Sequence, residues 1–171
     1  MNKQLLRIWV KEKRKELDMA KISAILADKL VQIEEYKNAK NIMLFYPLKD
    51  EVDLLSILED KSKNFYLPRI NGDELECCPY CASEELCISR FHTKEPICEA
   101  CAKSEIDLII VPALACDKNN FRLGYGKGFY DRFLKDYKGK TISCIPHEFF
   151  VETVFPFESD IKIDRVLTDL L

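Results

Sequence analysis

A glycine-rich stretch, "RLGYGKGFYDRFL" at residues 122–134, holds residue types suited to binding a phosphate group. The chain has five glycines, and three of them, Gly124, Gly126 and Gly128, fall here at every second position. Glycine lets backbone N–H groups approach an anion closely, and a helix that begins nearby adds partial positive charge. We therefore interpret this stretch as an anion-binding loop.

Charged side chains in and after the loop extend this interpretation. Arg122 and Lys127 can add full positive charges, and Asp131 is an oxygen ligand of the kind that Mg²⁺ takes beside a phosphate. The spacing G-x-G-x-G matches neither the dinucleotide-binding G-x-G-x-x-G nor the P-loop. Two alternatives stay open: a tight turn with solvated Arg122 and Lys127, and an Asp131 that stabilises the helix dipole.

The elements on either side must position this loop. "DLIIVPAL" (107–114) is continuous, branched and apolar, as in a parallel strand that is buried on both faces. A helix is predicted from about Gly128 to Tyr137. Ligands of open α/β sheets bind beyond the carboxyl ends of the strands, so the loop lies where a site is expected.

Strands and helices alternate along the rest of the chain. Further helices are predicted at 2–17, from an Asp18 N-cap to Ile33, and at 53–59, and further strands at 41–47, 65–68, 141–146 and 160–167. This order predicts an α/β fold, with three αβα layers around a largely parallel central sheet, in a single domain over 1–171. The last strand is expected at an edge of the sheet, and residues 71–105 are expected to be irregular.

The predicted first helix carries its positive charges on one side. Lys3, Arg7, Lys11 and Arg14 recur at spacings of four, four and three, so they share one face of the helix. Such a face is commonly solvated, and that alternative stays open for Lys3 and Arg7.

Composition and charge limit the classes of function. Hydrophobic residues make up 47% and charged residues 32%, a balance typical of a globular protein, and the net charge of −3 argues against a nucleic-acid partner. The longest apolar run, 108–116, contains Pro112 and is too short to span a membrane, and basic residues interrupt any signal-like run at the N-terminus. We expect a cytoplasmic monomer that acts on small molecules, with no nucleic-acid or membrane partner.

The segment "IDLIIVPALACDKNNFRLGYGKGFYDRFL" (106–134) resembles the signature of the 5-formyltetrahydrofolate cyclo-ligase family, also called methenyltetrahydrofolate synthetases. "KQLLR" (3–7), "FYPLKDEVD" (45–53) and "DIKIDRVLTD" (160–169) are similar to the family's nucleotide-binding helix, folate-site segment and C-terminal strand. The resemblance covers essentially the whole chain. It implies an enzyme that converts 5-formyltetrahydrofolate and ATP into 5,10-methenyltetrahydrofolate, ADP and phosphate, with Mg²⁺. The γ-phosphoryl group would activate the formyl oxygen, and the folate's N10 would then close the ring.

The same resemblance implies a role for each matching residue. ATP would be bound by Lys3, Arg7, Arg122, Leu123, Gly124, Tyr125, Gly126, Lys127, Gly128, Phe129 and Tyr130. The folate would be bound by Tyr46 and Glu51, with its formyl end lined by Tyr125, Gly126, Lys127, Gly128 and Phe129. Lys127, Arg122 and Tyr125 would be catalytic, and Asp131 and Asp164 would hold Mg²⁺. Considered alone, Tyr46 could be a core aromatic, Glu51 a helix cap and Asp164 a surface acid.

The cysteines between 77 and 101 depart from the family pattern. Cys78, Cys81, Cys98 and Cys101 have the C-x₂-C…C-x₂-C spacing of a zinc ribbon. The flanking segments align with the family without an insertion, so we expect thiols here rather than structural zinc, and Cys116 is expected to pack in the core. Two rival functions stay open: a phosphate-ligand enzyme on a similar sheet that does not use ATP, and a zinc-ribbon interaction module.

Overall fold

The computed structural model describes residues 1–170, and within them a mostly parallel sheet forms the centre of the molecule. Its strands lie in the order β11-β9-β6-β1-β2-β3. Their bounds are β1 (Asn41–Met43), β2 (Asn64–Asn71), β3 (Glu74–Pro79), β6 (Leu108–Ile110), β9 (Lys140–Ile145) and β11 (Arg165–Thr168). Neighbours from β11 to β2 pair in parallel, and β3 pairs antiparallel with β2. The predicted α/β class is confirmed, and β11 lies at an edge as expected.

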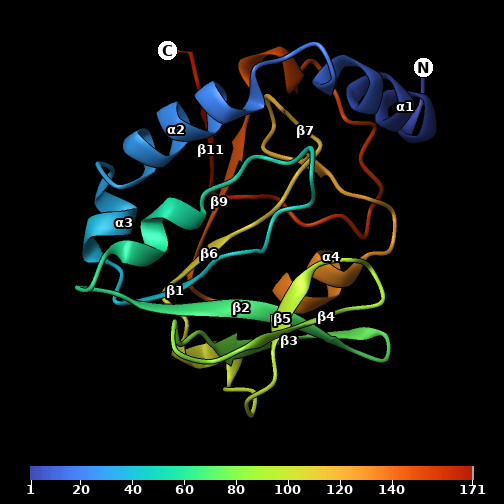
Figure 1. Cartoon of the computed structure of the whole chain (residues 1–171). Coiled ribbons are helices and arrows are strands. Elements are labelled where there is room, and N and C mark those ends of the chain that lie inside the picture. Colours follow the sequence, from blue (N-terminus) through green and yellow to red (C-terminus); the bar gives the residue numbers. More distant parts are fainter. Residues whose placement is uncertain (171) are drawn as a thin grey trace.

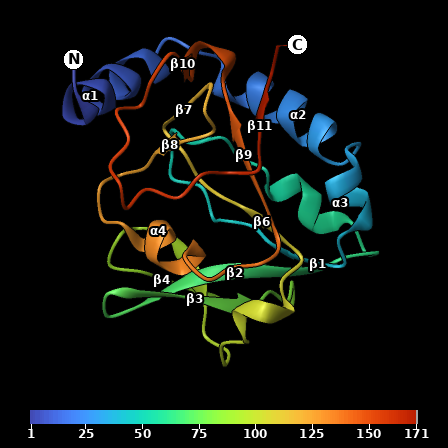
Figure 2. The same ribbon diagram turned by 180° about the vertical axis from the view of Figure 1, so that it is seen from behind.

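Helices cover both faces of this sheet (Figures 1 and 2). Figure 1 shows α2 (Met19–Leu30) and α3 (Glu34–Asn38) along one face, with α4 (Phe129–Leu134) on the other. The side chains of β6 alternate between the two: Leu108 and Ile110 pack in one core cluster with Leu26 of α2, and Ile109 packs with Phe133 of α4. Because both faces of β6 are buried, its sequence is apolar throughout.

A smaller sheet carries the glycine stretch. It consists of β7 (Ala115–Asp117), β8 (Arg122–Leu123) and β10 (Phe150–Val151), and the apolar face of α1 (Lys3–Arg14) packs on it through Leu6 and Val10. The single strand predicted over 107–114 is therefore wrong. The chain leaves the central sheet after Ile110, because Pro112 has no N–H to continue the ladder, and enters the smaller sheet at Ala115.

The region expected to be irregular, 71–105, contains regular structure. β2 and β3 form a hairpin with Gly72 and Asp73 as its two loop residues, with Gly72 at a φ of +62°, and Arg69 faces Glu76 across it in an ion pair of 2.9 Å. A second hairpin joins β4 (Leu86–Ile88) to β5 (Lys94–Pro96). A Gly-Asp pair between two strand-like runs is a hairpin signal, so the sequence did contain a mark of β3.

The helices begin near the predicted N-caps but are shorter than predicted. The side chain of Asp18 caps α2 by accepting from the Lys21 N–H at 3.1 Å, as predicted. The helix predicted after Asp53 is a 3₁₀ helix, η1 (Leu55–Glu59), and two further 3₁₀ turns are η2 (Lys103–Glu105) and η3 (His147–Phe149). Residues 160–164 precede β11 rather than forming its first half. No helix within residues 1–170 is both long and apolar enough to cross a membrane.

A buried carboxylate fixes the turn between β7 and β8. Asp117 is fully buried, and its Oδ1 accepts from the backbone N–H groups of Asn119 (2.9 Å) and Phe121 (3.1 Å). Its Oδ2 accepts from the N–H of Val154 at 3.0 Å. The carboxylate thus accepts hydrogen bonds from three backbone N–H groups that have no carbonyl partner in a β-ladder.

Asp117→Ala should lower the free energy of unfolding by about 3 kcal/mol or more, because it leaves three backbone donors without their acceptor. The matched control is Asp18→Ala, which removes one exposed cap and should cost about 1 kcal/mol. Urea unfolding followed by circular dichroism measures both. Equal losses in the two variants would show that the Asp117 carboxylate does not hold the turn.

Candidate active site

A cavity of about 880 Å³ opens where β1 and β6 leave the central sheet at their carboxyl ends. Phe45 follows β1 and Pro112 follows β6, and both line the cavity. Its other walls come from α1, the glycine stretch, the β4–β5 hairpin and residues 157–161. The volume suits a substrate of a few hundred daltons or more.

Most of the predicted site residues line this one cavity. They come from segments far apart in the sequence: Lys3, Arg7, Tyr46, Glu51, Arg122, Gly124, Tyr125, Gly126, Lys127, Gly128, Phe129, Tyr130 and Asp131. Two predicted residues do not line it. Leu123 is fully buried in the core cluster beneath α1, and Asp164 is exposed outside the cavity.

Two cations of α1, Lys3 and Arg7, line the cavity, whereas Lys11 of the same predicted face is exposed and does not line it. Lys3 is 8% exposed; its ammonium pairs with Asp160 and lies 4.0 Å from the ring centroid of Phe157. The Arg7 Nε donates to the carbonyl oxygen of Gly124 at 2.8 Å. Lys3 lies on the same buried side of the helix as Leu6 and Val10, so the stripe that anchors α1 to the smaller sheet also brings this cation to the cavity.

The glycine stretch uses backbone conformations that other residues avoid. Gly126 has a φ of +101° and Gly128 a φ of +71°, both in the left-handed region, and Gly128 is the residue before α4. A Cβ at Gly128 would lie 2.8 Å from the Arg132 Nη1, and one at Gly126 would lie 3.5 Å from the Arg7 guanidinium carbon. The positive φ values, more than these contacts, therefore favour glycine at both positions.

Arg122 and Asp131 form the charged centre of the cavity wall. The Arg122 side chain is buried, with Nη2 at 3.6 Å from the Asp131 Oδ2, Nη1 donating to the Pro112 carbonyl at 3.3 Å, and Nε without a partner among the described atoms. The other carboxylate oxygen of Asp131 accepts from the Ile161 N–H at 3.1 Å. Asp131 is thus held on two sides and faces the cavity with its remaining lone pairs.

Glu51 and Tyr125 lie together on the side nearer β1. Burial raises the pKa of the Glu51 carboxyl, and the Leu48 N–H, Arg14 and the Tyr125 hydroxyl lower it. Burial also raises the pKa of Tyr125 to about 12, so its phenol is neutral near pH 7 and can donate a hydrogen bond. Tyr46 both packs on the core, as its alternative role required, and lines the cavity.

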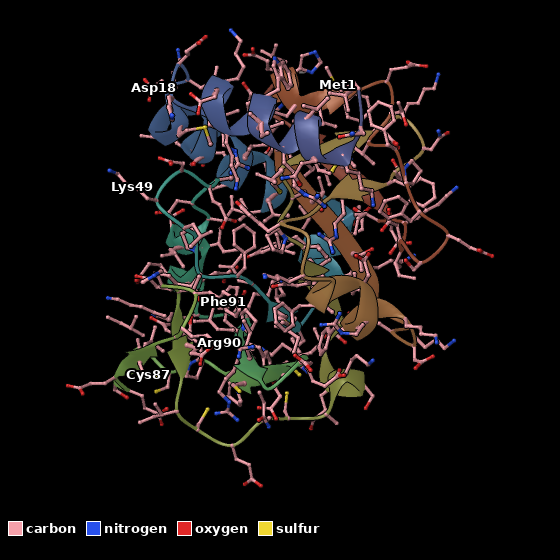
Figure 3. All side chains as sticks on the ribbon, turned by 90° about the vertical axis from the view of Figure 1, so that its right-hand side faces the viewer. Met1, Asp18, Lys49, Cys87, Arg90 and Phe91 are labelled. Atoms are coloured by element: carbon pink, nitrogen blue, oxygen red, sulfur yellow. The ribbon has the colours of Figure 1, made fainter. Side chains whose placement is uncertain are left out.

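The structure adds three residues that sequence reasoning did not single out for the site. Asp160 holds Lys3, and Arg14 contacts Tyr125 from within the protein. Phe91, at the tip of the β4–β5 hairpin, packs edge-on against Phe129 at 5.9 Å between ring centroids. In Figure 3, Phe91 lies between the hairpin and α4, whereas Lys49 points away from the molecule. The shared face of Arg14 with Lys3 was a signal in the sequence that could have pointed to it.

The two predicted magnesium ligands are not brought together. Asp131 lines the cavity, but the Asp164 Oδ2 accepts from the Thr141 N–H at 2.9 Å and from its hydroxyl at 3.0 Å, beside β9. Among residues 1–170, no group of three or more His, Cys, Asp and Glu side chains is arranged to hold a metal. One carboxylate together with phosphate oxygens and water is still a donor set that Mg²⁺ accepts, so Asp131 fits this role.

The cysteines of 77–101 pair differently from the zinc-ribbon pattern. The sulfur atoms of Cys77 and Cys101 lie 3.3 Å apart, while Cys98 Sγ lies 3.3 Å from the Pro79 carbonyl and Cys81 is exposed beside Ser83. Burial raises the pKa of the Cys77 thiol, and that of the Cys101 thiol to about 12, so both are neutral thiols near pH 7. Cys116 is fully buried in the core cluster beneath α1, as predicted.

Comparison with known proteins gives one family. The model of the "5-formyltetrahydrofolate cyclo-ligase family" matches residues 1–169. The 5-formyltetrahydrofolate cyclo-ligase of Mus musculus is 29% identical over an alignment that covers 96% of this chain and 88% of that protein. A probable 5-formyltetrahydrofolate cyclo-ligase of Schizosaccharomyces pombe is 26% identical, with 85% and 83% covered.

Solved structures agree with this fold. The structure of 5,10-methenyltetrahydrofolate synthetase from Aquifex aeolicus superposes with a TM-score of 0.89 at 31% identity, and the match covers 100% of this chain and 91% of that one. A 5,10-methenyltetrahydrofolate synthetase from Mycoplasma pneumoniae, 23% identical, superposes with a TM-score of 0.80 over 99% of both chains and shares the fold.

Protein purified without added metal should carry well below one zinc per chain, because the four ribbon cysteines are not gathered around one point among residues 1–170. Elemental analysis measures the zinc, with the variant that has serine at 78, 81, 98 and 101 as the blank. Stoichiometric zinc that is lost in the serine variant, together with a lower melting temperature after chelation, would show a structural zinc site instead.

Proposed function

Because the chain belongs to the 5-formyltetrahydrofolate cyclo-ligase family, we propose that it drives ring closure of 5-formyltetrahydrofolate with ATP, in the presence of Mg²⁺, and releases ADP and phosphate. The conversion of 5-formyltetrahydrofolate into 5,10-methenyltetrahydrofolate is the activity of this ligase family and of this chain. The observation that carries the proposal is the cavity that joins the α1 cations and the glycine stretch to Glu51 and Tyr125.

The phosphates of ATP are assigned to the side of the cavity formed by α1 and the glycine stretch. Lys3, Arg7 and Arg122 offer positive charge there, and Gly126 and Gly128 let backbone N–H groups approach an anion without side-chain obstruction. The guanidinium of Arg122 has an unpartnered Nε within the described structure, which supports a role in binding a further acceptor such as a phosphate oxygen.

The folate is assigned to the side formed by Tyr46 and Glu51. An ionised Glu51 accepts hydrogen bonds from ligand N–H groups, and the Tyr46 ring offers a flat apolar surface. Tyr125 belongs to the glycine stretch and also affects the pKa of Glu51, so it links this side to the phosphate side. A formyl group placed here would face both Tyr125 and the terminal phosphate of ATP.

The chemistry then requires positioning and charge stabilisation. The formyl oxygen attacks the γ-phosphorus, the bond from that phosphorus to the ADP oxygen breaks, and ADP leaves. The folate's N10 next attacks the formyl carbon, loses its proton, and expels the former formyl oxygen as part of phosphate. Lys127 and Arg122 stabilise the charge that develops on the transferred group, while Tyr125 orients the formyl end. Mg²⁺, held by Asp131, would neutralise phosphate charge.

Absorbance spectroscopy tests this function directly. Purified protein with 5-formyltetrahydrofolate and Mg-ATP should form the methenyl product, with one ADP released for each ring closed. Omitting either ATP or Mg²⁺ should stop the reaction. Product formation at the full rate without nucleotide would reject the ATP-dependent mechanism, and product formation without divalent metal would reject the role of Mg²⁺.

Lys127→Ala should lower kcat by about 10²-fold, the loss typical when one donor to a developing charge is removed. The affinity for folate should change little, because the charge is needed most as the phosphoryl group moves. Lys138→Ala, an exposed lysine outside the cavity, is the matched control. A Lys127→Ala enzyme that keeps the parent kcat would remove this lysine from the mechanism.

Asp131→Asn should raise the Mg²⁺ concentration needed for half-maximal rate, because an anionic oxygen ligand is replaced by a neutral one of the same size. The amide oxygen can still accept from the Ile161 N–H, so the fold of this segment should be kept. Asp136→Asn, exposed and outside the cavity, serves as control. Superimposable Mg²⁺ titrations for Asp131→Asn and the parent would count against coordination by Asp131.

A further inference from the structure

The last residue of α1 places a positive charge inside the protein. Arg14 is 4% exposed and does not line the cavity. Its Nη2 donates to the Ala113 carbonyl at 3.1 Å, its Nη1 donates to the Tyr125 hydroxyl at 3.1 Å, and its Nε has no partner among the described atoms. Within residues 1–170, no carboxylate lies within ion-pair distance of it. A buried guanidinium with so little compensation is costly and calls for a role.

The groups beyond Arg14 are those assigned to the folate. The Tyr125 hydroxyl accepts from Arg14 at 3.1 Å, and it lies near enough to Glu51 to lower the pKa of that carboxyl. Glu51 is 9% exposed and receives one hydrogen bond, from the Leu48 N–H at 3.2 Å. The charge of Arg14 therefore lowers the pKa of this buried carboxyl without an ion pair between the two side chains. Tyr130 is a further titratable group near Glu51; burial raises the pKa of its phenol, and the charge of Glu51 helps to raise it.

We propose that Arg14 is a positioning residue of the cyclo-ligase reaction, which holds the Tyr125 hydroxyl and the Glu51 carboxylate in the arrangement that binds folate. It acts from behind the cavity wall and does not touch the substrate. This inference rests on the proposed function, because it takes the Glu51 side of the cavity as the folate side.

Electrostatics supports this role. Burial raises the pKa of Glu51, and the positive charge of Arg14 lowers it. Without Arg14, Glu51 takes up a proton at a higher pH, and a protonated carboxyl is no longer an acceptor at both oxygens. A purely structural role would need only the bond to the Ala113 carbonyl, which ties the end of α1 to the segment before β7.

Binding of 5-formyltetrahydrofolate, measured by calorimetry without ATP, tests the proposal through Arg14→Gln and Arg14→Lys. Arg14→Gln should raise the Kd for folate about 10- to 100-fold near pH 7, the effect of losing a charge-assisted hydrogen bond. Folate affinity falls at low pH as Glu51 is protonated. In Arg14→Gln this fall, the acid limb of the pH profile, should begin at a higher pH. Arg14→Lys restores the charge and should recover part of both losses.

Lys13→Gln, on the solvent side of the same turn, is the matched control and should leave folate binding unchanged. The effect of Arg14→Gln should shrink in a Tyr125→Phe background, because the two changes remove one shared contact. The KM for ATP should stay near the parent value.

An unshifted acid limb in a folded Arg14→Gln protein would overturn the proposal, and so would equal losses for folate and ATP with a lower melting temperature. Failure of the proposed function gives a different result. Parent protein that makes no methenyl product with Mg-ATP would reject the reaction, while the folate-binding series, measured without nucleotide, would still decide the role of Arg14.

Discussion

The buried carboxylate of Asp117 is the contact on which the geometry of the cavity depends. By accepting three backbone hydrogen bonds, it closes the turn between β7 and β8 and ties that turn to Val154. The glycine stretch leaves β8 directly after this turn, and residues 157–161 leave the segment after Val154. Two walls of the cavity that are distant in sequence are therefore set by one side chain that no ligand touches.

Charge balance is the second constraint on the site. Three combinations of opposite charge surround the cavity: Lys3 with Asp160, Arg122 with Asp131, and Arg14 with Glu51 through Tyr125. Each cation is buried or nearly so, and the Arg122–Asp131 contact is long at 3.6 Å. Buried charges that are only partly compensated favour a ligand that brings its own charges. In the proposed function, the phosphates of ATP bind beside Lys3 and Arg122, and the folate binds beside Glu51.

Residue types and spacing predicted much of this arrangement, and the rest depended on three-dimensional packing. The alternation of apolar strand-like runs with helices indicated a mostly parallel sheet. It could be recognised because the spacing of apolar residues in a strand or a helix is a local property of the sequence. The break at Pro112 was hidden inside one apolar run, since the two halves are buried in different sheets. Similarity of the segment 160–169 to the family could not say which acid faces the cavity: Asp160 does, and Asp164 bonds to Thr141.

The pairing of α1 with the glycine stretch also affects how the molecule is made on the ribosome. Arg14 and its partner Tyr125 are 111 positions apart, which corresponds to roughly 5 to 20 seconds of synthesis at ~5–20 residues per second. During this interval the apolar stripe of α1, with Leu6 and Val10, has emerged while the strands that cover it are still being translated. The nascent helix therefore keeps this apolar stripe uncovered until the strands of the smaller sheet have been made.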